Sequence, residues 1–206
     1  MNLIYRDDSL LIVNKPAGLL AVPGRGADKQ DCLSARIQQK FPDALVVHRL
    51  DMSTSGLMVF ARGAEMQRRF SQLFRERMIE KRYVAVVEGR LEPASGVVDL
   101  PIAADWPNRP LRKIDVASGK PALTRFRVLS HDTATGTSRV ELEPVTGRTH
   151  QLRLHMAAIG HPVLGDALYG RVDSIKAERM MLHARVLGFV HPLSGEPLHL
   201  VSEPPF

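Results

Sequence analysis

The sequence predicts an α+β fold: a mixed, mostly antiparallel central sheet with few flanking helices and long loops. Three observations predict it. Short β-rich apolar runs recur along the 206 residues, only three segments have the apolar spacing of a helix, and strands and helices do not alternate regularly as in a parallel α/β sheet. A chain of this length fits one domain or two small, tightly joined ones.

The first elements are expected to be a hairpin and a helix. Apolar runs at Leu3–Tyr5 and Leu10–Val13 flank a turn-like stretch, which indicates paired strands. A surface loop rich in glycine, proline and aspartate follows. We expect Asp31 to cap a helix whose apolar residues recur every four positions and which ends at Pro42.

The later elements follow from the same patterns. Proline, glycine and aspartate are frequent at Pro93–Ala122, which predicts short strands joined by long loops. The other expected strands are Leu45–Val47, Leu57–Ala61, Tyr83–Val87, the pair Thr124–Leu129 and Ser138–Leu142, Leu182–Val190 and Leu198–Val201. The other expected helices are Ala64–Met78 and Thr149–Ile159.

The charge of the chain favours a polyanionic partner. The formal net charge is +6 and the isoelectric point is about 9.8. Residues 62–82 hold seven basic and three acidic residues, so this segment carries four of the six net charges, mostly as arginine, which suits phosphate. An arginine-rich composition without any nucleic-acid role gives the same charge, and charge alone leaves both open.

Several classes of protein are excluded by what the sequence lacks. It has no apolar run long enough for a membrane helix and no secretory signal, and the lone Cys32 suits a reducing compartment, so we expect a cytoplasmic protein without a membrane partner. It has no phosphate-binding loop, nucleophile elbow or complete dinucleotide fingerprint. His150 and His155 are five residues apart, which does not place two ligands on one helix face, so we expect no metal site.

The stretch His48–Gly56 is the most informative one, because it places a carboxylate beside an arginine on a loop of small residues. Small residues let a substrate approach the backbone closely. Asp51 is a candidate nucleophile or base, and Arg49 a candidate ligand of phosphate or of a displaced base. The alternative is that Asp51 only caps a turn and pairs with Arg49 at the surface.

A second stretch, Pro144–Met156, runs into the predicted third helix. Thr149, Arg153 and Met156 are expected on one helix face, and a helix N-terminus beside Arg148 favours anions. Arg153, if it reaches the sheet, could keep Asp51 ionised. An ordinary surface helix with a few cations explains the same spacing.

On these motifs the sequence resembles the RluA family of pseudouridine synthases. The family signature, His-Arg-Leu-Asp followed by Ser/Thr-Ser-Gly, matches His48–Gly56. Further similar blocks keep their order along the chain: Val13–Gly18, Lys81–Ala85, Gly147–Arg153, Gly160–Asp166 and Leu182–Ala184. The segment Asp105–Pro110 and the chain length resemble the RluA branch of the family.

The resemblance implies a pseudouridine synthase fold and a role for each matching residue. Asp51 matches the catalytic aspartate, Arg153 the arginine paired with it, Tyr83 the tyrosine that stacks on the target base, and Leu182 the apolar floor of the pocket. Arg49 matches the residue that fills the place of the flipped uridine. We also expect RNA contacts from the remaining basic residues of these segments: His48, Arg62, Arg68, Arg69, Arg75, Arg82 and Arg148.

The implied reaction converts uridine to pseudouridine in structured RNA without a cofactor, since substrate and product are isomers. Within the RluA branch the resemblance implies tRNA, 23S rRNA or both as partners, at uridine 32 of the anticodon loop and uridine 746 of 23S rRNA. Residues 1–206 are expected to form a single catalytic domain with no appended RNA-binding domain, acting as a monomer. The alternatives are a non-catalytic RNA-binding or ribosome-assembly protein and, less favoured, a metal-dependent nuclease that uses Asp51.

Overall fold

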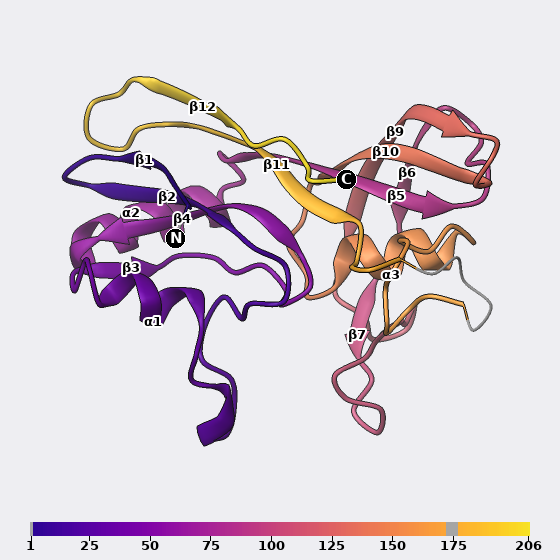
Figure 1. Cartoon of the computed structure of the whole chain (residues 1–206), viewed down its shortest axis with the longest axis horizontal. Coiled ribbons are helices and arrows are strands. Elements are labelled where there is room, and N and C mark those ends of the chain that lie inside the picture. Colours follow the sequence, from indigo (N-terminus) through magenta and orange to yellow (C-terminus); the bar gives the residue numbers. More distant parts are fainter. Residues whose placement is uncertain (1, 172–176) are drawn as a thin grey trace. The chain divides into compact units, whose positions relative to one another are not determined.

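The computed structural model describes residues 2–171 and 177–206 and divides the chain into two compact units (Figure 1). Unit 1 comprises residues 1–81 and 183–205, and unit 2 comprises residues 82–182 and residue 206. Within each unit the strands pair antiparallel, apart from the parallel pair of β4 (Ser55–Arg62) with β11 (Leu182–Val190), and three α-helices lie in the described part of the chain. The predicted α+β class with a mixed, mostly antiparallel sheet is confirmed.

Unit 1 begins with the predicted hairpin, in which β1 pairs with β2. The central strand β4 pairs with β2 along one edge and with β11 and then β3 along the other. β12 pairs with β11. The elements of this unit are β1 Asn2–Arg6, β2 Leu10–Lys15, a 3-10 turn Ala27–Lys29, α1 Leu33–Gln38, β3 Ala44–Val46, β4 Ser55–Arg62, α2 Gly63–Arg75, most of β11 Leu182–Val190, and β12 Pro197–Val201.

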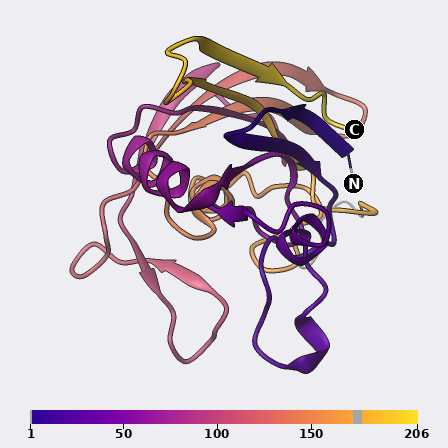
Figure 2. The same cartoon turned by 90° about the vertical axis from the view of Figure 1, so that its left-hand side faces the viewer.

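β2 and β4 are buried on both faces, and the helices α1 and α2 lie beside the strands of unit 1 (Figures 1 and 2). Met66 and Phe70, four residues apart on α2, are buried in the core with Val59 of β4. Phe70 meets Phe189 of β11 edge to face at 5.2 Å between ring centroids. The predicted amphipathic helix is therefore confirmed, although it ends at Arg75 rather than Met78.

The cap predicted for α1 is wrong. Cys32, not Asp31, is the N-cap: its Sγ accepts a hydrogen bond from the backbone N–H of Ala35 at 3.5 Å. The carboxylate of Asp31 instead forms a bidentate pair with Arg36, with both distances 2.7 Å. Because the Arg36 guanidinium binds the Asp31 carboxylate, Asp31 does not cap the helix, and the N-cap is the next residue, Cys32.

Unit 2 consists of an antiparallel sheet in the order β5-β10-β9-β6, a small hairpin and one helix. Its core joins β5 and β10 to α3 through residues such as Ala85, Val140 and Met156. Its elements are most of β5 Glu80–Glu88, then β6 Ser95–Asp99, β7 Ile102–Ala104, β8 Arg112–Ile114, β9 Leu123–Asp132, β10 Thr137–Pro144 and α3 Gln151–Ala158. The strands predicted from alternation are confirmed.

Candidate active site

The loop that carries Asp51 connects β3 to β4 and is tied down at both ends. Asp51 is partly buried, Arg49 is exposed, and the N–H of Thr54 donates to the carbonyl of Asp51 at 3.1 Å. This turn leads directly into Ser55, the first residue of β4. The fold therefore places the predicted carboxylate on a fixed turn at one end of a buried central strand.

His48 fixes the start of this loop. Its Nε2 accepts a hydrogen bond of 3.0 Å from the N–H of Val59, and its ring lies 4.7 Å from that of Phe74. Burial, with the nearby charge of Lys81 adding to it, lowers the pKa of His48 from 6.5 to about 3. His48 is thus neutral near pH 7. Its Nε2, the ring nitrogen with a lone pair, already accepts the hydrogen bond from Val59 and is not available to RNA.

A fully buried lysine anchors the same loop. Nζ of Lys15 donates to the carbonyls of Pro16 and Leu19, each at 2.8 Å, and to that of Met52 at 3.1 Å. The N–H of Gly18 donates to the Met52 carbonyl as well, at 2.9 Å. Lys15 was not among the predicted site residues, although a lysine at the end of the largely apolar strand Leu10–Lys15 was visible in the sequence.

The small residues of the signature have a structural reason. Gly56 has φ +117, and a Cβ there would lie 2.3 Å from the carbonyl oxygen of Ala184, so only glycine lets β11 approach β4 this closely. The hydroxyl of Ser55 lies 2.8 Å from Nδ1 of His183. Because Nε2 of His183 faces the Ser202 carbonyl at 3.0 Å and must donate to it, Ser55 donates to Nδ1.

Of the residues predicted to surround the target base, Tyr83, Arg153 and Leu182 belong to unit 2. Tyr83 lies on β5 opposite Leu142 of β10 and is partly buried. Leu182 is buried in the core cluster against which Tyr83 packs, and Leu152 of α3 belongs to the same cluster. Tyr83 and Leu182 therefore belong to the same hydrophobic core as α3, the helix that carries Arg153.

Arg153 forms a buried bidentate pair with Asp166. Both N–O distances are 2.7 Å, and the side chains of the arginine and the aspartate are 5% and 0% exposed. The Asp166 carboxylate also accepts from the N–H groups of Leu168 and Tyr169. Burial raises the pKa of Asp166, but Arg153 and these two amides lower it by more, so it lies below 3.8.

The helix around Arg153 differs from the prediction at its start. α3 begins at Gln151, because His150 adopts a left-handed conformation with φ 57, so Thr149 does not share a helix face with Arg153. Residues 151–156 are all buried, which excludes the alternative of an ordinary surface helix. Arg148 is exposed before the helix, where its Nε donates to the carbonyl of Pro121 at 3.0 Å.

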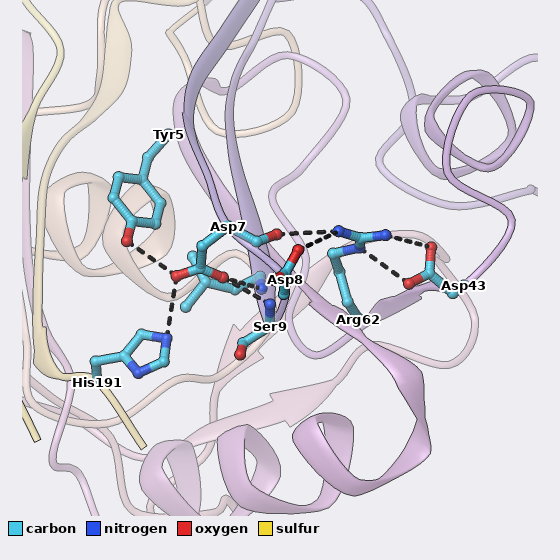
Figure 3. A network of polar contacts seen from close by, with 8 residues as sticks. Tyr5, Asp7, Asp8, Ser9, Asp43, Arg62 and His191 are labelled. Atoms are coloured by element: carbon cyan, nitrogen blue, oxygen red, sulfur yellow. Dashed lines mark hydrogen bonds and ion pairs between the residues drawn. The ribbon is translucent and has the colours of Figure 1, made fainter. Parts of the chain in front are cut away.

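The basic segment is partly engaged in ion pairs within the protein. Arg62 binds Asp43 at 2.9 Å and lies 3.9 Å from Asp8, in a network that also joins Asp7, Tyr5 and His191 (Figure 3). Its side chain is 24% exposed. This network holds Arg62 at the end of β4 opposite to Ser55 and gives it a structural role within unit 1.

The other arginines of the segment are more accessible. Arg68 and Arg69 on α2 are exposed and pair with Glu65, at 3.7 and 2.8 Å. Arg82 on β5 lies 3.5 Å from Glu141, and Arg75 is exposed in the last turn of α2. The arginines of such exposed pairs can leave their carboxylate partners to bind phosphate, since each pair contributes at most about 1 kcal/mol to stability.

Comparison with known proteins agrees with the motifs. The sequence profile of the family described as RNA pseudouridylate synthase matches residues 9–158. The dual-specificity RNA pseudouridine synthase RluA of Yersinia pestis is 46% identical over 207 residues, covering 100% of both chains, and that of Escherichia coli is 48% identical over 197 residues, covering 95% of this chain and 90% of the relative. The solved structure of human RNA pseudouridylate synthase domain containing 1 is 32% identical, with a TM-score of 0.83, and the match covers 100% of this chain and 84% of the human one.

No helix in the described part of the chain is long and apolar enough to span a membrane.

Proposed function

The chain belongs to the RNA pseudouridylate synthase family and is an RNA-modifying isomerase, and we propose that Asp51 is its catalytic carboxylate. Support comes from the match of His48–Gly56 to the family signature and from the fixed turn on which the structure holds Asp51. In the reaction the bond from ribose C1′ to uracil N1 breaks and a bond from C1′ to C5 forms. N1 gains a proton and C5 loses one, so the atoms balance without an oxidant or reductant.

We propose that Arg153 orients and ionises Asp51. A guanidinium has five N–H donors, and Asp166 takes two of them, so the capacity of Arg153 to bind a second carboxylate is not used up by the buried pair. An ionised carboxylate is the form that attacks as a nucleophile or removes a proton. The pairing of Asp51 with Arg153 is a prediction that rests on the family resemblance.

The target base must leave its helix or loop stack to reach a carboxylate. We propose that Tyr83 then stacks on it, over the apolar floor formed by Leu182, and that Arg49 fills the vacated place. Stacking on an aromatic ring returns about 1–3 kcal/mol of the cost of flipping. The exposed arginines Arg68, Arg69, Arg75 and Arg148, with Arg82, are proposed to hold phosphates, with His48 and Arg62 supporting the fold beside them.

For the substrate we propose tRNA and 23S rRNA, because the bacterial relatives carry the name dual-specificity RNA pseudouridine synthase. Uridine 32 of the anticodon loop and uridine 746 of 23S rRNA are the expected positions. Action as a monomer in the cytoplasm, with residues 1–206 forming one catalytic domain, is proposed from the sequence alone.

The test is to replace Asp51 by Asn and measure tritium release from RNA labelled at C5 of uridine, since the new bond displaces that hydrogen. We expect no release with this variant, while RNA affinity stays within a few-fold of wild type. Asp28→Asn, on the exposed 3-10 turn, is the control and should remain active. Turnover by Asp51→Asn would refute the assignment, and wild-type protein that binds RNA without isomerising it would favour the binding-protein alternative.

A further inference from the structure

The hairpin β7–β8 presents the single tryptophan of the chain to solvent. Trp106 is 67% exposed, although aromatic residues of this size are usually largely buried. Residues 106–110, which follow β7, are all exposed. Figure 1 shows the chain beyond β7 running away from the strands β5, β9 and β10 of the same unit. This placement gives Trp106 no role in the core of unit 2.

The tip of this hairpin is ordered by its own hydrogen bonds. The N–H of Asn108 donates to the carbonyl of Asp105 at 3.2 Å, and its side-chain amide donates to the Asp105 carboxylate at 3.0 Å. The N–H of Leu111 donates to the Asn108 carbonyl at 3.0 Å. A partner that binds here pays little for ordering the backbone.

One face of the indole is already occupied by a cation. The guanidinium carbon of Arg109 lies 4.8 Å from the ring centroid of Trp106, which is a cation–π contact. Trp106 is 67% exposed even with the Arg109 guanidinium over one face of its ring. A flat π-surface beside a fixed cation matches a nucleotide, whose base stacks while its phosphate meets the guanidinium.

The surrounding charge favours RNA over a protein partner. Residues 105–120 hold four basic and two acidic residues, and Asp115 is engaged by Lys113 and by its own turn. The exposed neighbours of Trp106 are Pro107, Asn108 and Arg109, which do not form the contiguous apolar patch of a protein interface.

The hairpin is joined to the helix that carries Arg153. The N–H of Arg112 donates to the Tyr169 hydroxyl at 2.9 Å, and that hydroxyl is hydrogen-bonded to Nδ1 of His150 at 2.8 Å. The ring of Tyr169 lies 5.2 Å from the guanidinium carbon of Arg153. These hydrogen bonds fix the position of the hairpin relative to α3 within unit 2.

We propose that Trp106 and Arg109 form a platform that stacks an unpaired base of the RNA substrate and binds its phosphate, at a nucleotide other than the uridine being isomerised. This inference rests on the proposed function for the identity of the substrate. The platform would help to select RNA loops with a splayed-out base, because a base held in a stem cannot reach the indole.

The single tryptophan makes the test direct. In the inactive Asp51→Asn background, titration with an anticodon stem-loop RNA should quench Trp106 fluorescence, because a stacked base quenches indole emission. With the active protein, Trp106→Ala should raise KM about 5- to 150-fold and leave kcat within about two-fold, the range expected from the loss of one stacked base. Trp106→Phe should recover most of this loss. Val116→Ala, 83% exposed elsewhere on this segment, should behave as wild type.

Arg109→Gln tests the phosphate contact separately. It should lower the slope of log affinity against log salt by about 0.7, the value for one phosphate contact on a single strand. The proposal is overturned if RNA binds without quenching, or if Trp106→Ala keeps the wild-type KM. It is also overturned if the protein self-associates and Trp106→Ala abolishes that association without changing KM. Quenching by a wild-type protein that never isomerises uridine would refute the proposed function and leave the platform standing.

Discussion

Removing the carboxylate of Asp166 is expected to be far more damaging than removing a surface carboxylate with the same geometry. Asp166→Ala leaves the guanidinium of Arg153, 5% exposed, without its bidentate partner. It also removes the acceptor of the Leu168 and Tyr169 amides. The exposed pair of Arg185 and Glu203 has the same N–O distance of 2.7 Å and serves as the comparison.

The magnitude follows from burial. Four charge-assisted hydrogen bonds at about 1.5–3 kcal/mol each would total about 6–12 kcal/mol, but this sum ignores the cost of taking both charges out of water. Breaking a buried pair by removing one partner costs about 3–5 kcal/mol, and we expect Asp166→Ala to lose that much unfolding free energy. Glu203→Ala should lose at most about 1 kcal/mol, because water screens the exposed pair.

The assay is urea-induced unfolding, followed by circular dichroism. The folded-state pKa of Asp166 lies below 3.8, so its stabilisation is present above that pH and is lost as pH falls through the folded-state value. The difference between wild type and Asp166→Ala should therefore persist at pH 5 and shrink as pH falls from about 3.8 through the folded-state pKa.

A loss from Asp166→Ala no larger than that from Glu203→Ala would refute the reasoning, since burial would then have no energetic consequence. A second variant separates stability from orientation. Arg153→Met with Asp166→Leu replaces the buried pair by apolar side chains and should recover much of the stability. Under the proposed function it should remain inactive on RNA.

Two further predictions concern the loop of Asp51. Lys15→Met removes three hydrogen bonds from a buried ammonium group and should cost at least about 2 kcal/mol of unfolding free energy. It should also lower kcat about ten-fold, because the Met52 carbonyl loses this donor, while exposed Lys29→Met changes neither quantity. An unchanged kcat would contradict an anchoring role. His48 binds a proton in the unfolded protein below pH 6.5 but in the folded protein only near pH 3, so stability falls with pH in this window. Between pH 6.5 and 5 the wild type should lose up to about 2 kcal/mol more than His48→Gln in urea unfolding, and equal losses would show that His48 is protonated normally.

Local patterns in the sequence predicted most of the strands. Alternation and turn residues located the first hairpin and the pair β9–β10, because these contacts join neighbouring segments of the chain. Helix ends were predicted less well. Asp31 binds Arg36 and does not cap α1. His150 adopts a left-handed conformation, so α3 begins two residues later than predicted. The spacing of apolar residues indicates neither effect.

The residues of the candidate site could be predicted from the sequence only in part. Asp51 could be singled out only because a whole motif matched a family, since one aspartate beside an arginine is more often a turn cap. Lys15 and Asp166 received no role from the sequence, because their partners are backbone carbonyls or an arginine thirteen residues away. A charged residue in an apolar run such as Leu10–Lys15 was the available signal for a buried, hydrogen-bonded charge.

The buried pair of Arg153 and Asp166 is better explained by orientation than by stability. Two charges taken from water gain little net free energy over apolar side chains of similar volume, so a stability argument alone does not account for the pair. A guanidinium gripped at two nitrogens, with the ring of Tyr169 5.2 Å away, cannot rotate without breaking both hydrogen bonds. Its other donors therefore point in a fixed direction before any substrate binds. Catalysis gains from donors that need no reorganisation during the reaction, and Arg153 fits that requirement as the partner proposed for Asp51.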